Sequence, residues 1–124
     1  MQHHYERPMA KAMYILGQIG AIICHESGPC PQTAVLTKMA SRPAEGFSIA
    51  VASMDELCSP QLGNRRTLLR WKHREIRRLR RMLPDPLPTA ASAQSQMPFW
   101  DGYCRYWQDM LKADAQNDAE RPAA

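Results

Sequence analysis

Apolar residues recur at intervals of three and four along Pro8–Cys24, and this spacing is the strongest constraint on the fold. Side chains at such intervals lie along one face of an α-helix. Pro8 suits the first helical position, where its missing N–H costs no hydrogen bond. The uncharged run Ala12–Cys24 has 13 residues, fewer than the roughly 18 of a membrane-spanning helix. We therefore predict a buried helix and no membrane span.

Two glycines, Gly17 and Gly20, lie inside this predicted helix. Each glycine costs about 1 kcal/mol of helix stability relative to alanine. The backbone of a second helix approaching closely explains their presence, and a weak stretch of exposed helix is the alternative.

Four further helices are predicted, and no stretch of useful length alternates between apolar and polar residues as a half-buried strand does. The second helix spans Pro31–Ala40, and the third begins at Pro43 after a cap at Ser41 or Arg42, with Phe47, Ile49 or Ala50, Val51, Met54 and Leu57 as its apolar positions. Asn64 caps the fourth, which ends at Leu83 before a proline, and the fifth spans Phe99–Lys112. The fold class is therefore all-α, a compact bundle of about five helices.

The expected organisation is a helical bundle over residues 1–83 and a linker over 84–98, followed by an aromatic helix over 99–112. The linker is rich in proline at its start, which predicts a stiff first part and a flexible second part. Residues 113–124 are polar, and we expect a disordered tail there.

Positive charge is concentrated in the fourth predicted helix. The chain carries 16 Lys and Arg against 12 Asp and Glu. Segment 64–83 contains nine of these cations and one acid, for a net charge of +8, whereas the other residues sum to 7 − 11 = −4. A mildly acidic chain with one basic helix indicates a localised surface for a polyanion.

Guanidinium groups bind phosphate oxygens through two parallel hydrogen bonds, and a helix of arginines can follow a sugar-phosphate backbone without reading bases. Arg70, Arg74, Arg77 and Arg81 recur at intervals of three and four and form the best single row. The full set of predicted nucleic-acid-binding residues is Arg65, Arg66, Arg70, Lys72, Arg74, Arg77, Arg78, Arg80 and Arg81. Glu75 is the only acid in the segment, so internal pairing does not neutralise this charge. A solvated face or an acidic protein partner is the alternative.

The aromatic residues Trp100, Tyr103 and Trp107 recur at helical spacing in the fifth predicted helix. We predict that they pack against the core or against neighbouring subunits, with stacking on unpaired bases as the alternative.

Cys24, His25, Cys30 and Cys58 raise the question of a zinc site, but the Cys-x5-Cys spacing is longer than that of a zinc knuckle and the second ligand pair is missing. We predict buried free thiols, no metal and no cofactor. No Ser/His/Asp grouping, phosphate-binding glycine loop or carboxylate pair stands out, so we expect no catalytic residues and no enzyme. The amino terminus lacks the basic region of a signal peptide, and we expect a cytoplasmic protein.

Two short motifs resemble a known family. Residues 14–23 read Tyr-Ile-Leu-Gly-Gln-Ile-Gly-Ala-Ile-Ile, and residues 40–47 read Ala-Ser-Arg-Pro-Ala-Glu-Gly-Phe. They are similar, in order and separation, to segments of the C-terminal helical bundle in the large subunit of C-subtype type I CRISPR Cascade, a bundle that is also made separately as the small subunit. The resemblance covers about residues 9–57.

This resemblance implies a non-catalytic, all-α small subunit of a crRNA-guided CRISPR effector complex, of type I or type IV. Such subunits stabilise the target or displaced strand through basic side chains, and they pack against other effector subunits and copies of themselves. Sequence-neutral phosphate contacts suffice, because guide pairing supplies the specificity. A small helical DNA-binding regulator, with Asn64, Arg65 and Arg66 near bases, is one alternative. A phage or mobile-element adaptor or inhibitor with an acidic protein partner is another.

Overall fold

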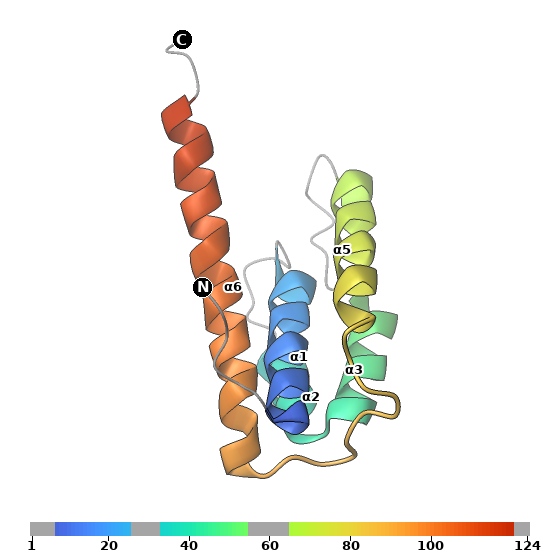
Figure 1. Ribbon diagram of the computed structural model, residues 1–124. Coiled ribbons are helices and arrows are strands. Elements are labelled where there is room, and N and C mark those ends of the chain that lie inside the picture. The colour runs from blue at the N-terminus through green and yellow to red at the C-terminus, as the bar shows by residue number, and fades with distance from the viewer. Residues whose placement is uncertain (1–6, 26–32, 55–64, 121–124) are drawn as a thin grey trace.

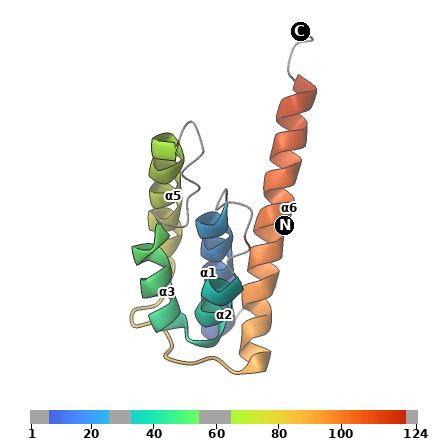
Figure 2. The ribbon, with the colours of Figure 1, turned by 180° about the vertical axis from the view of Figure 1, so that it is seen from behind.

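The computed structural model describes residues 7–25, 33–54 and 65–120, which form five α-helices and no strand. The helices are α1 (Pro8–Cys24), α2 (Thr33–Ser41), α3 (Pro43–Ala52), α5 (Arg65–Arg80) and α6 (Ala93–Glu120). The prediction of an all-α helical bundle is confirmed. Figures 1 and 2 show α1 between α6 on one side and α5 with α3 on the other.

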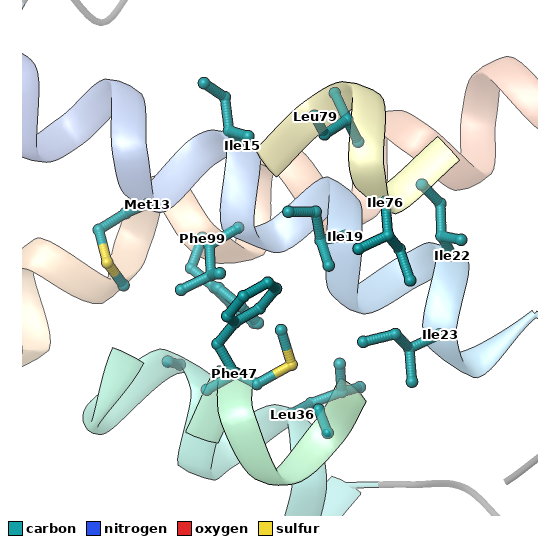
Figure 3. Packing of buried hydrophobic residues seen from close by; sticks show 14 of the residues in the cluster. Met13, Ile15, Ile19, Ile22, Ile23, Leu36, Phe47, Ile76, Leu79 and Phe99 are labelled. Atoms are coloured by element: carbon teal, nitrogen blue, oxygen red, sulfur yellow. The ribbon is translucent and has the colours of Figure 1, made fainter. Parts of the chain in front are cut away.

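Helix α1 is the centre of the bundle and packs against all four other described helices. Its bounds match the prediction, with Pro8 in the first turn. Leu16, Ile19 and Ile22 are completely buried, because neighbours cover α1 on several faces. Phe99 of α6 and Phe47 of α3 enter the same core, and Figure 3 shows both among the α1 side chains.

The close helix approach predicted at the α1 glycines is confirmed, and it involves α6. A Cβ atom at Gly17 would overlap the carbonyl oxygen of Phe99, and a Cβ at Gly102 would overlap the carbonyl oxygen of Tyr14. Only glycine permits the two backbones to lie this close. At Gly20 the nearest atom to an added Cβ is a side-chain atom, Cδ2 of Leu36, at 3.0 Å.

Helix α3 begins at Pro43 with Arg42 as its N-cap residue, one of the two caps predicted. Of the two candidates for its apolar position, Ala50 is completely buried whereas Ile49 is 42% exposed. The predicted cap at Asn64 and the predicted apolar residue Leu57 lie outside the described residues.

Helix α6 is longer at both ends than predicted. It begins at Ala93 rather than at Phe99, and it continues to Glu120 through a region predicted as a disordered tail. Ser92 Oγ accepts a hydrogen bond from the Ser95 backbone N–H at 3.2 Å, which satisfies one free donor of the first turn. Pro98 removes a single backbone donor, so it lies inside α6 without ending the helix.

The connection between α5 and α6 is consequently shorter than the predicted linker and is fastened to the bundle. The Ala44 N–H donates to the Pro88 carbonyl at 3.0 Å, and the Ala91 N–H donates to the Ser41 carbonyl at 2.9 Å. These bonds satisfy a free donor at the start of α3 and a free acceptor at the end of α2. The part of the linker predicted to be flexible is therefore hydrogen-bonded to the bundle at Ala91.

Candidate nucleic-acid interface

Helix α5 lies at the edge of the bundle, near α1 (Figure 1). It packs against α1 through a narrow apolar face. Ile76 and Leu79 are buried there, and Leu69 and Leu83 pack at its margin. Figure 3 shows the Ile76 and Leu79 side chains turned toward α1, where Ile15 and Ile22 lie. The predicted apolar seam at intervals of three and four thus fixes which side of α5 faces the solvent.

The opposite side of α5 is an exposed arginine surface. An α-helix turns by about 100° per residue. Three residues of the predicted phosphate row, Arg70, Arg74 and Arg77, therefore point about 140–200° around α5 from Lys72, away from α1. Arg81 follows in the turn after the helix. All seven arginines of α5 and the following turn whose side chains are described are exposed: Arg66, Arg70, Arg74, Arg77, Arg78, Arg80 and Arg81. The Arg65 side chain lies outside the described set.

We define the outer arginine row as Arg70, Arg74, Arg77 and Arg81. Eleven residues separate its ends, which places them about 16 Å apart along α5 at 1.5 Å per residue. One strand of B-DNA carries a phosphate about every 3.4 Å along its axis, so the row spans about five phosphates. Within the described part of the chain, no member of the row forms an ion pair. Four guanidinium groups therefore remain available on one solvent-facing line.

Two arginines beside this row have protein partners. Arg78 forms an ion pair with Glu75, with 3.0 Å between Nη2 and Oε1. The Arg80 guanidinium lies over the Phe47 ring, 5.5 Å from its centroid, in a cation–π contact. These contacts position the two side chains at the margins of α5 and leave the outer arginine row as the main cationic feature.

Lys72 is not part of the exposed surface, and its prediction as a phosphate ligand is wrong. The residue is completely buried, and its Nζ donates a hydrogen bond to the Ile23 carbonyl at 2.8 Å. That carbonyl belongs to the last turn of α1, where backbone acceptors lack helical partners and a cation interacts favourably with the helix dipole. Lys72 precedes Ile76 by four residues and Leu79 by seven, a spacing that already places it on the buried face.

The three predicted interface aromatics occupy different environments on α6. Tyr103 packs against the core cluster, and burial raises the pKa of its hydroxyl. Trp107 lies beside His25 at the end of α1, with 5.5 Å between ring centroids, and His25 also contacts Trp71 of α5 at 5.3 Å. Trp100 is 38% exposed. Their role in binding another subunit stays a prediction, for which Trp100 has the most accessible surface.

The cysteines whose positions are described have contrasting surroundings. Burial raises the pKa of the Cys24 thiol to about 11, although nearby Lys72 opposes the shift. Cys104 is exposed on α6. No group of three or more His, Cys, Asp or Glu side chains lies close enough to hold a metal ion in the described ranges. Cys30 and Cys58, considered above as ligands, lie outside those ranges.

Comparison of the chain with protein-family models, with curated proteins and with solved structures finds no match in any of the three. Within residues 7–25, 33–54 and 65–120, no helix combines the length and the apolar character needed to cross a lipid bilayer.

Proposed function

We propose that this chain binds the sugar-phosphate backbone of nucleic acid through the outer arginine row, without reading base sequence. The observation that carries the proposal is the line of four exposed guanidinium groups with no ion-pair partner among the described residues, on the side of α5 opposite the core. Exposed cations without acids beside them attract polyanions, and the planar guanidinium group of arginine donates two parallel hydrogen bonds to phosphate oxygens.

The rigid support of this row favours backbone binding over a purely solvating role. Ile76 and Leu79 anchor α5 to α1, and Lys72 joins the two helices through a hydrogen bond. The arginines therefore project from a helix whose rotation is fixed. A fixed row with regular axial spacing matches a regular phosphate chain better than it matches an irregular acidic protein surface.

We further propose that the chain acts as a non-catalytic small subunit of a crRNA-guided CRISPR effector complex, of type I or type IV. The resemblance at residues 14–23 and 40–47 supports this assignment. The first motif forms the part of α1 that contacts α6, and the second forms the α2–α3 junction. A phosphate-binding helix without base readout fits an assembly in which the guide RNA supplies sequence recognition.

Fluorescence anisotropy with labelled oligonucleotides tests backbone binding. Two unrelated sequences, each as single strand and as duplex, are titrated with the protein at several salt concentrations. We expect similar affinities for the unrelated sequences and a steep fall with salt, since each phosphate contact releases a counterion. A large preference for one duplex sequence would instead indicate a DNA-binding regulator, and no binding would indicate an adaptor for an acidic protein.

A charge-matched pair of variants locates the site. The first variant replaces the outer arginine row by Gln at all four positions. The control replaces four exposed cations away from α5 by Gln: Arg7, Lys11, Arg42 and Lys112. Loss of four phosphate contacts should reduce the duplex salt slope by about 3.6, at about 0.9 per contact. The control changes net charge equally and should retain most of the slope. Equal loss in both variants would refute a localised site.

The assembly proposal has a separate test. The gene of a small effector subunit is expected beside the gene of a CRISPR backbone subunit, and the tagged chain should copurify with that subunit and the guide RNA when they are coexpressed. Backbone binding without such copurification would retain the arginine site and refute the CRISPR assignment.

A further inference from the structure

A cavity of about 420 Å³ opens to the solvent between α3 and the chain that follows α5. Figures 1 and 2 show this part of the chain passing α3 on its way to α6. The walls of the cavity include Phe47 of α3, Arg80 of α5 and the segment 83–87. Small-molecule sites usually have volumes of roughly 300–1,000 Å³. The cavity therefore has room for a ligand of the size of a nucleobase.

The walls of this cavity are held in place by the bundle. Leu83 and Leu87 pack against the core cluster. The Leu83 N–H donates a hydrogen bond to the Arg80 carbonyl at 3.0 Å, which fixes the turn after α5. The hydrogen bond between the Ala44 N–H and the Pro88 carbonyl joins the connection to α3. A ligand therefore meets formed walls, and little ordering of the chain opposes its binding.

Two opposite charges face this cavity without neutralising each other. Arg80 and Asp85 both line it and are both exposed. Among the residues that the structure describes, neither forms an ion pair. The Phe47 ring lies against one face of the Arg80 guanidinium, 5.5 Å from its central carbon. The cavity thus combines a supported planar cation with a carboxylate that can accept hydrogen bonds.

The cavity lies directly beside the outer arginine row. Arg77 precedes Arg80 by three residues, and side chains at this interval are neighbours on a helix surface. Arg81 follows Arg80 in the chain. A strand whose phosphates contact Arg77 and Arg81 therefore passes the mouth of the cavity. An unpaired nucleotide of that strand can turn its base toward Arg80 while its phosphate stays on the row.

We propose that this cavity binds one unpaired guanine base of the strand that the outer arginine row holds. Unpaired bases stack on guanidinium planes, and Arg80 supplies such a plane. The Watson–Crick edge of guanine carries two adjacent donors, N1–H and the N2 amino group, which match the two oxygens of the Asp85 carboxylate. Adenine and cytosine place a ring-nitrogen acceptor beside their amino group, and thymine places its single N–H between two carbonyl oxygens. Each of these edges would direct an acceptor at the carboxylate.

This inference rests on the proposed backbone binding and adds a preference at one position of the strand. The contacts of the outer arginine row remain neutral to sequence. Unrelated single strands of mixed sequence each contain guanines, so they still bind with similar affinity. Base pairing occupies the Watson–Crick edge, so the preference is confined to unpaired guanine.

Fluorescence anisotropy with an oligothymidylate strand, and with the same strand carrying one central dG, tests the cavity. We expect the dG strand to bind about tenfold more tightly, in line with the usual contribution of one stacked base. A central dA or dC should give a smaller gain, and annealing a complementary strand should abolish the gain. Salt-dependent binding with no difference between the strands would refute the base site and retain the outer arginine row. Absence of binding to either strand would refute both proposals.

Matched variants separate recognition of the base from net charge. Asp85→Asn should remove most of the dG gain without weakening binding to oligothymidylate, because the substitution removes an acid. Asp109→Asn changes the net charge equally at an exposed position of α6 and should keep the gain. Arg80→Lys keeps the charge but lacks the plane and should reduce the gain, whereas Arg78→Lys outside the cavity should not. A full dG gain in Asp85→Asn, or equal losses in the variants and their controls, would overturn the proposal.

Photochemical cross-linking locates the base. The central guanine is replaced by 6-thioguanine, the complex is irradiated, and the linked peptides are identified by mass spectrometry. We expect the links in residues 44–48 of α3 or in residues 80–87. Links confined to α1 or α6 would place the base elsewhere and overturn the proposal.

Discussion

Substitution of Gly17 by alanine should destabilise the protein, although alanine is the better helix former. The added methyl group meets the backbone of α6, with the Phe99 carbonyl carbon at 2.8 Å and the Tyr103 nitrogen at 2.9 Å. Ordinary contact begins near 3.4 Å, so these atoms must move apart by at least about half an ångström. Backbone atoms cannot relieve the overlap by changing rotamer. The two helices must therefore separate.

The magnitude follows from two opposing terms. Overpacking costs about 1–3 kcal/mol, and a backbone collision belongs near the upper value. The gain in helix propensity from Gly to Ala is about 1 kcal/mol. The expected net loss is therefore about 2 kcal/mol, or roughly 8 °C in Tm for a chain of this size. Urea unfolding followed by circular dichroism measures the free energy directly, and calorimetry measures Tm.

Gly20→Ala is the matched control on the same helix. Its new methyl group would meet the side chain of Leu36 at 3.0 Å and the ring of Phe99 at 3.4 Å. The Leu36 side chain can shift by a few tenths of an ångström, so the propensity gain offsets most of the cost. We expect a change within about 1 kcal/mol of zero. If Gly17→Ala were as stable as Gly20→Ala, the close approach of α1 and α6 would be refuted.

Three further predictions concern the polar groups inside the bundle. Lys72→Met should lower the free energy of unfolding by about 1–3 kcal/mol, since the Ile23 carbonyl loses its donor. It should leave the affinity for oligonucleotides unchanged in anisotropy titrations, and a lower affinity would contradict the burial of the Lys72 side chain. Near neutral pH, iodoacetamide should modify exposed Cys104 much faster than Cys24, because burial raises the pKa of the Cys24 thiol and suppresses its thiolate. Peptide mass spectrometry measures the two rates, and equal rates would argue against the burial of Cys24. Burial raises the pKa of Tyr106 from 10.0 to about 12, so the folded state retains a proton that the unfolded state releases; stability is fully present below pH 10 and should fall as pH rises toward 12. Urea midpoints should therefore decrease over that range, and Tyr106→Phe should reduce the decrease.

Several parts of the structure follow from local rules in the sequence. The bounds of α1 are predictable because Pro8 marks a first turn and the apolar spacing continues without interruption. The orientation of the outer arginine row is predictable because an apolar seam on the same helix determines the opposite face. The close approach at Gly17 is predictable as an event, but its partner is not, since the contacting residues lie far along the chain in α6.

The remaining features depend on tertiary contacts. Pro98 suggests a boundary when read locally, yet α6 continues through it because its early turns pack on α1 and Ser92 caps the start. Helical spacing alone places Lys72 on the buried face of α5, but its hydrogen-bond partner, the Ile23 carbonyl at the end of α1, is apparent only from the structure.

The central position of α1 has a consequence for biosynthesis. Among the described helices, α1 leaves the ribosome first and α6 last, and domains begin to fold as the chain emerges. The Gly17 face of α1 remains without its partner until α6 has been synthesised. We expect the nascent chain to expose this apolar face during most of its synthesis. Chaperones that bind exposed apolar surface should therefore bind these early intermediates.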